Sequence, residues 1–226
     1  MYECLLKLTE GNTAEIFQLD SNRILKLFKL GYSKDSMLHE YRNHQVVSEL
    51  LDNVPKLYEI VEENGRFGYT MEQIKGRNLA ELLLNEHTFA KAMEQFVSLH
   101  REWNKEASSE VISYKDWMKA TLENKDNVSE LLKKINQLPE GNTLCHGDFH
   151  PYNILVTAEN KPIVIDFANV CKAPKEYDIA RTYFLMEEAG AKQLAEVYLE
   201  KMKISFEEIK EYYEITAQLR SFELEP

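Results

Sequence analysis

The chain has 226 residues, enough for one domain or two small lobes with a core that needs no disulfide or metal to fold. The 27 basic and 38 acidic residues give a net charge of −11. That balance excludes the broad basic surface with which proteins bind nucleic acid or anionic lipid without sequence preference. Three scattered cysteines, no signal peptide and no membrane-length apolar run predict a soluble, cytoplasmic protein.

The first 75 residues are predicted to form a small sheet with one main helix. The strand-like runs are residues 2–9, 15–19, 24–28, 57–61 and 67–74. Asn64-Gly65, between the last two, is a hairpin turn signal. Apolar residues at helical spacing predict a helix over 36–51.

A boundary is predicted at Lys75-Gly76-Arg77, where the composition changes. The helical runs beyond it are 79–84, 88–103, 114–135 and 177–222, with short apolar runs and a hairpin over 143–167. The sequence therefore predicts an α+β protein with a nucleotide-binding lobe over 1–75 and a larger helical lobe over 76–226. A cleft between two lobes is a usual place for a ligand.

The densest polar cluster is His146-Gly-Asp148-Phe-His150-Pro-Tyr-Asn153, which lies between apolar runs. A turn follows over 158–161, and then an apolar strand that ends at Asp166. With a two-residue turn centred on 159 and 160, Asn153 is predicted to face Asp166 across the hairpin at about 4.5–5.5 Å. Amide and carboxylate oxygens are ligands that suit Mg²⁺.

These residues resemble the catalytic loop and metal-binding segment of the protein-kinase-like fold. His146-x-Asp148-x-x-x-x-Asn153 has the spacing of H-R-D-x-x-x-x-N, and Asp166-Phe-Ala stands where D-F-G would. The variant H-G-D-x-H-P-x-N is typical of the aminoglycoside phosphotransferase and choline kinase-like family. The resemblance implies a bilobal fold and transfer of the γ-phosphate of MgATP, or of GTP, to a hydroxyl of a small acceptor such as an aminoglycoside, an amino-alcohol or a sugar.

The resemblance also implies roles for individual residues. Asp148 would orient the acceptor hydroxyl, and Asn153 and Asp166 would hold Mg²⁺. Lys26 would contact the phosphates and pair with Glu40 on the next helix; Lys29, on the opposite strand face, is the competitor for that role. The further expected nucleotide contacts are Thr13, Glu72 and Ile74. The expected structural supports are His146, His150, Asp178 and Arg181.

The phosphate-covering loop departs from the protein-kinase pattern, because Gly11-Asn-Thr-Ala-Glu15 holds a single glycine. Two other functions stay open. One is a kinase-like protein that binds nucleotide without transferring phosphate. The other is a metal-dependent hydrolase in which His146, Asp148 and His150 hold Zn²⁺. The acidic surplus favours an amine-bearing acceptor, and the oligomeric state cannot be predicted from the pattern.

Overall fold

The computed structural model describes residues 5–223, so the start of the strand expected over 2–9 lies outside the described residues. The described chain forms two compact units. Unit 1 contains the described residues up to Leu79 together with Tyr152–Ala168. Unit 2 contains Ala80–Pro151 and the described residues from Asn169 onward.

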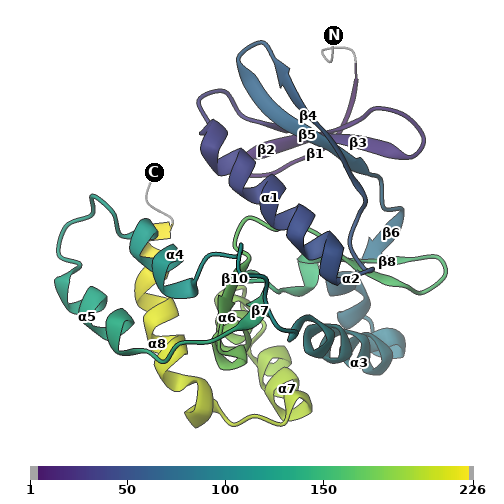
Figure 1. Ribbon diagram of the computed structural model, residues 1–226. Helices are drawn as coiled ribbons and strands as arrows, with labels where there is room; N and C mark the ends of the chain where they lie inside the picture. Colours follow the sequence, from purple (N-terminus) through teal and green to yellow (C-terminus); the bar gives the residue numbers. More distant parts are fainter. Residues whose placement is uncertain (1–4, 224–226) are drawn as a thin grey trace. The chain divides into compact units, whose positions relative to one another are not determined.

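Unit 1 contains an antiparallel sheet of five strands in the order β1-β2-β3-β5-β4 (Figure 1). The strands are β1 (Leu6–Glu10), β2 (Ala14–Gln18), β3 (Arg23–Phe28), β4 (Leu57–Glu63) and β5 (Arg66–Glu72). Asn64 and Gly65 join β4 to β5 with φ of 51° and 74°, the left-handed pair that a tight hairpin turn needs. Asp20 shapes the turn before β3, because its Oδ1 accepts hydrogen bonds from the amides of Asn22 and Arg23.

Helix α1 (Lys34–Leu50) packs on this sheet. Ser33 caps it and accepts a hydrogen bond from the amide of Ser36. Met37 at the start of α1 joins a buried apolar cluster with Phe28 of β3 and Tyr69 of β5. Since a helix places residues three and four apart on one face, the same packing turns Glu40, Asn43 and His44 inward, and all three are buried.

A second, three-stranded sheet completes unit 1, with the order β6-β8-β9. Its strands are β6 (Gly76–Asn78), β8 (Ile154–Thr157) and β9 (Pro162–Val164). The two units therefore differ from the lobes expected to divide at residue 75, because Tyr152–Ala168 belongs to unit 1. The hairpin joins unit 1 because β8 pairs with β6, and because the amide of Val164 donates to the carbonyl oxygen of Asn53 at 2.8 Å.

The predicted register of this hairpin is wrong by one residue. Ile154 pairs with Val164 and Leu155 with Ile163, so Asn153 lies level with Ile165 rather than with Asp166. The cause is a three-residue loop instead of a two-residue one. Its last residue, Asn160, has a φ of 64°, which asparagine tolerates better than most residues do.

Unit 2 is mainly helical, with one two-stranded sheet of β7 (Thr143–Cys145) and β10 (Cys171–Ala173) (Figure 1). Helix α2 (Leu79–Leu83) begins at the boundary between the units. The other helices are α3 (Glu86–Trp103), α4 (Tyr114–Thr121), α5 (Ser129–Gln137), α6 (Lys175–Glu188), α7 (Lys192–Met202) and α8 (Phe206–Glu223), and a single 3₁₀ turn (Pro151–Asn153) precedes β8.

The single helix predicted over 114–135 is wrong, since α4 and α5 are separate. Asn124 and Asn127, in the connection, have φ of 62° and 60°, and left-handed residues end a helix. The predicted α+β class, with an antiparallel sheet in the N-terminal part and helices in the C-terminal part, is confirmed. Within residues 5–223, no helix has both the length and the apolar character needed to cross a membrane.

Candidate functional site

Lys26 lies in the middle of β3, and its ammonium group is enclosed by two carboxylates. Its Nζ is 2.5 Å from Oε1 of Glu40, so the ion pair expected between these residues is present. The same Nζ is 3.4 Å from Oδ1 of Asp166. Tyr69, opposite Lys26 on β5, donates its hydroxyl to Oε1 of Glu40 at 2.6 Å. The competitor Lys29 is half-exposed and pairs with Glu10 at the surface.

The electrostatics of this cluster keep Lys26 charged. Burial alone would lower the pKa of Lys26, but the negative charges of Glu40 and then of Asp166 outweigh that effect and raise it above its usual value. The Lys26 and Glu40 side chains are 10% and 2% exposed, whereas that of Asp166 is 43% exposed. The pair is thus buried, and one carboxylate next to it stays accessible to a ligand.

Asp166 and Asn153 could supply oxygen ligands to a metal ion, and both belong to unit 1. The donor set fits Mg²⁺, which takes one or two carboxylates and completes its shell with phosphate and water. Within residues 5–223, no group of three or more His, Cys, Asp or Glu side chains could hold a metal ion by itself. His146, Asp148 and His150 form no such group among these residues.

The loop around Asp148 belongs to unit 2. Burial by itself would raise the pKa of Asp148, but its hydrogen bond with His150 and the charges of His150, His146 and Arg181 lower that pKa to about 2. Nε2 of His150 is 3.5 Å from Oδ2 of Asp148. His146 is buried, and its Nδ1 accepts a hydrogen bond from the amide of Asp148 at 3.2 Å. The Asp148 side chain is therefore an ionised carboxylate at neutral pH.

Asp178, in the first turn of α6, holds the start of this loop. Its two carboxylate oxygens accept hydrogen bonds from the amides of His146 and Gly147 at 2.9 and 2.8 Å. Nε2 of His100 lies 3.0 Å from Oδ2 of Asp178, and Nδ1 of His100 lies 2.7 Å from the hydroxyl of Tyr198. This buried chain from α7 through α3 to α6 fixes the position of the two loop amides.

Arg181, one turn further along α6, holds the same loop through a carbonyl group. Its Nε donates to the carbonyl oxygen of Gly147 at 2.5 Å, and its Nη1 donates to Glu223 of α8. Gly147 has a φ of 74°, and a β-carbon there would collide with the carbonyl oxygen of Asn169. Glycine is thus required at this position of the loop.

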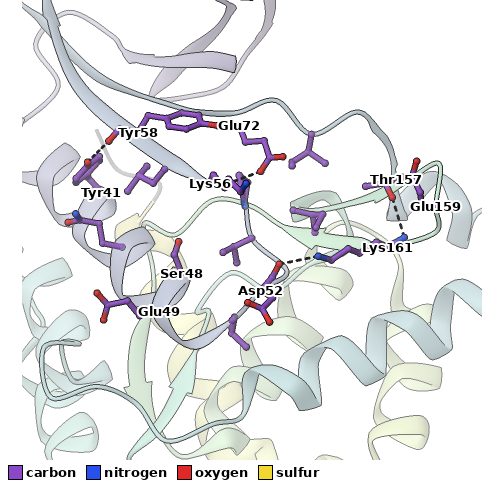
Figure 2. Close-up of a pocket in the computed structure, with 17 residues that line it drawn as sticks. Tyr41, Ser48, Glu49, Asp52, Lys56, Tyr58, Glu72, Thr157, Glu159 and Lys161 are labelled. Carbon is purple, nitrogen blue, oxygen red and sulfur yellow. Dashed lines mark hydrogen bonds between the residues drawn. The ribbon is translucent and has the colours of Figure 1, made fainter. Parts of the chain in front are cut away.

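The three expected nucleotide contacts lie at opposite ends of the five-stranded sheet: Thr13 is next to the C-terminal end of β3, whereas Glu72 and Ile74 are near its N-terminal end. The carbonyl oxygen of Thr13 accepts a hydrogen bond from the amide of Lys29 at 2.9 Å, so this oxygen helps to fix the loop before β2. The Glu72 side chain accepts a hydrogen bond from the amide of Lys56 (Figure 2), which ties β5 to the start of β4. Glu72 and Ile74 line a pocket of about 830 Å³ in unit 1.

Sequence reasoning did not single out Asn43, Tyr69 or Tyr198, and it assigned no special role to His44. Asn43 Nδ2 donates to the carbonyl oxygen of Phe167 at 2.9 Å, and the His44 ring lies 4.3 Å from the Phe167 ring. Helical spacing could have predicted that Asn43 and His44 face inward, because they lie three and four positions after Glu40 on α1. No local pattern marks Tyr198, which meets His100 from a distant helix.

Comparisons with known proteins concern the family and the fold of the chain. A model of the phosphotransferase enzyme family matches residues 5–201. A thermostable mutant of the aminoglycoside phosphotransferase APH(4)-Ia has a similar structure, with a TM-score of 0.70, 16% identity, and coverage of 96% of this chain and 87% of that one. A search of curated protein sequences found no match.

Two further solved structures have the same fold. An aminoglycoside-3'-phosphotransferase of type VIII has a TM-score of 0.70 at 17% identity, covering 95% of this chain and 93% of that one. APH(2")-IIa, solved as a ternary complex with streptomycin and ATP, has a TM-score of 0.65 at 17% identity, covering 97% and 84%. At these identities the likeness concerns the fold.

Proposed function

Because the chain belongs to the phosphotransferase enzyme family, we propose that it is a small-molecule kinase that transfers the γ-phosphate of ATP to an alcohol. The observation that carries the proposal is the position of Lys26. Its ammonium group is buried against Glu40 and still lies within 3.4 Å of the accessible carboxylate of Asp166. A fixed cation beside an exposed metal-type ligand is an arrangement that suits the charged phosphates of a nucleotide.

The residues of unit 1 would bind the nucleotide. Lys26, oriented by Glu40, contacts the α- and β-phosphates, while the backbone near Glu72 and Ile74 binds the adenine. Asn153 and Asp166 hold Mg²⁺, which when bound neutralises charge on the phosphates. GTP is the alternative donor, since adenine and guanine would meet the same backbone groups.

Asp148 of unit 2 would orient the acceptor hydroxyl and accept its proton late in the reaction. Its pKa of about 2 makes it a weak base that is ionised at every physiological pH. A weak base is adequate in a loose phosphoryl-transfer transition state, where positioning and charge stabilisation contribute most of the rate enhancement.

The proposed acceptor is a small amine-bearing alcohol. Two observations support this class: the net charge of −11, and the streptomycin in the ternary complex of APH(2")-IIa, which has the same fold. The acidic surplus would attract a cationic acceptor, while the anionic nucleotide needs the local neutralisation that Lys26 and Mg²⁺ provide.

The test is a screen of ATP consumption with Mg²⁺ across aminoglycosides, amino-alcohols and neutral sugars. We expect turnover that depends on an acceptor and is fastest with an amine-bearing one. Turnover with neutral sugars alone would contradict the acceptor class. Saturable MgATP binding without turnover on any acceptor would favour the alternative of a nucleotide-binding protein without transfer activity.

Replacing Asp166 by alanine tests the proposed metal role. We expect the gain in nucleotide affinity that Mg²⁺ gives the wild type to fall by roughly 10- to 100-fold, because a ligand carboxylate is lost. Affinity measured without Mg²⁺ should stay close to that of the wild type. Titration calorimetry with a non-hydrolysable ATP analogue, with and without Mg²⁺, measures both values.

The matched control is Glu62→Ala, which removes an exposed carboxylate of unit 1 that pairs only with Lys34 among the ion pairs of the described residues. This variant should bind the nucleotide as the wild type does. An undiminished effect of Mg²⁺ in Asp166→Ala would refute the assignment of Asp166 as a metal ligand.

A further inference from the structure

We propose that Asn43 of α1 is a positioning residue, which holds the Asp166 carboxylate in the orientation that the metal site needs. The inference rests on the proposed function and adds to it a residue outside the motifs. Asn43 is 5% exposed, and it lies one turn after Glu40 on the inward face of α1. Its amide nitrogen reaches the backbone of the segment that carries Asp166.

Asp166 has a backbone conformation that needs support. Its φ is 70°, in the left-handed region that residues other than glycine rarely adopt. A residue in this region keeps its conformation only where the surrounding structure holds it. The direction of the Asp166 carboxylate therefore depends on the contacts that fix the residues on either side.

Both sides of Asp166 are fixed by hydrogen bonds. On the N-terminal side, the amide of Ile165 donates to the carbonyl oxygen of Asn153 at 2.9 Å. On the C-terminal side, Nδ2 of Asn43 donates to the carbonyl oxygen of Phe167 at 2.9 Å, and this bond is buried. The Phe167 ring is 1% exposed, and its centre lies 4.3 Å from that of the His44 ring.

The side chain of Asn43 is well suited to this contact. Its Nδ2 also lies 3.2 Å from Nε2 of His39, one turn earlier on α1. An amide carries two N–H groups, so one nitrogen can donate to both the Phe167 carbonyl and the His39 ring. A carboxylate of the same shape has no hydrogen to donate. Its negative charge would also be repelled by the partial negative charge of the Phe167 carbonyl oxygen.

The same helix face controls both charged groups of the site. Glu40 sets the position of Lys26, whose Nζ is 3.4 Å from Asp166. Asn43 sets the backbone that follows Asp166. Loss of the Asn43 contact would leave the Phe167 carbonyl without this donor. The backbone at Asp166 could then leave its left-handed conformation. The Lys26–Glu40 pair would remain.

Two variants test the proposal: Asn43→Ala removes the amide, and Asn43→Asp keeps its shape but removes the donor. Ser48→Ala is the matched control, because it deletes a hydrogen bond of similar length on α1, from Ser48 Oγ to the carbonyl oxygen of His44 at 2.8 Å. The first readout is amide hydrogen exchange of residues 165–168 in the protein without metal or nucleotide. We expect exchange about tenfold faster in both Asn43 variants and unchanged in Ser48→Ala.

The second readout is the Mg²⁺ concentration that gives half-maximal binding of a non-hydrolysable ATP analogue. We expect this concentration to rise about tenfold in both Asn43 variants, with excess Mg²⁺ restoring binding and with affinity in the absence of Mg²⁺ unchanged. A purely structural role would not be rescued by Mg²⁺. If Asn43→Asp does not fold, as thermal unfolding would show, Asn43→Ala alone decides the result.

Wild-type exchange and a wild-type Mg²⁺ requirement in a folded Asn43 variant would overturn the role of Asn43 and leave the proposed function intact. A wild-type protein that gains no nucleotide affinity from Mg²⁺ would instead refute the metal site on which the inference rests.

Discussion

Replacing Asp148 by asparagine is expected to lower kcat for phosphate transfer by about 10²- to 10⁴-fold. The nucleotide affinity should remain within about twofold of the wild-type value, because every proposed nucleotide contact lies in unit 1 and Asp148 lies in unit 2. The measurement combines steady-state transfer to the acceptor found by the screen with calorimetry of MgATP-analogue binding.

The substitution is informative because asparagine keeps the shape of the side chain and removes its charge. The backbone amide of Asp148 donates to the ring of His146, and this contact does not depend on the charge of the Asp148 side chain. The amides of His146 and Gly147 stay bound to Asp178. We therefore expect a folded protein with its loop in place.

Two controls separate chemistry from folding. The thermal unfolding temperature of Asp148→Asn should stay near that of the wild type, and the variant His87→Gln, on an exposed part of α3, should transfer phosphate normally. Wild-type turnover in Asp148→Asn would show that another group orients the acceptor hydroxyl.

The sequence predicts best where a local pattern determines the contact. The resemblance to kinase-like proteins implies that Lys26 pairs with Glu40, and the repeats of about two residues in a strand and 3.6 in a helix allow both side chains to point inward. Both residues then point into the space between β3 and α1, where a buried lysine needs a carboxylate partner. The structure contains that pair.

The prediction of the hairpin register was wrong for a physical reason as well. A two-residue turn and a three-residue turn between the same strands differ by one position, which moves every cross-strand partner. Asn160 supports the longer turn, because it adopts the left-handed conformation at its last position. The sequence of the loop allows either length, so the pairing of Asn153 with Asp166 could not be settled from it.

Asn43 shows what sequence reasoning misses altogether. An asparagine within a helix ordinarily suggests a solvent-exposed position, since its side chain competes with helical hydrogen bonds. Here it is buried because its partner, the Phe167 carbonyl, comes from a segment 124 residues away. Only the three-dimensional structure brings the two together.

The buried Lys26–Glu40 pair should have the largest effect on stability. Removing one partner, in Lys26→Met or in Glu40→Leu, is expected to lower the free energy of unfolding by about 3–5 kcal/mol, since a buried charge loses its main partner. The Lys26 and Glu40 side chains are 10% and 2% exposed, so solvent screens the remaining charge poorly. Urea unfolding monitored by circular dichroism measures each loss.

The exposed pair of Lys29 with Glu10 is the matched control, because it joins the same residue types at 3.1 Å with side chains 42% and 47% exposed. Lys29→Met and Glu10→Leu should leave the free energy of unfolding nearly unchanged, since water screens an exposed pair and ordering its side chains offsets the gain.

The double variant Lys26→Met with Glu40→Leu distinguishes stability from function. Because it removes both charges together, its loss of stability should be smaller than the sum of the two single losses by about 1–3 kcal/mol. The Tyr69 hydroxyl would still lose its carboxylate acceptor, so recovery should be incomplete. The double variant should nevertheless bind MgATP weakly, because the cation proposed to meet the phosphates is gone. Strictly additive losses of stability would contradict a direct buried pair, and wild-type nucleotide affinity would contradict the phosphate role of Lys26.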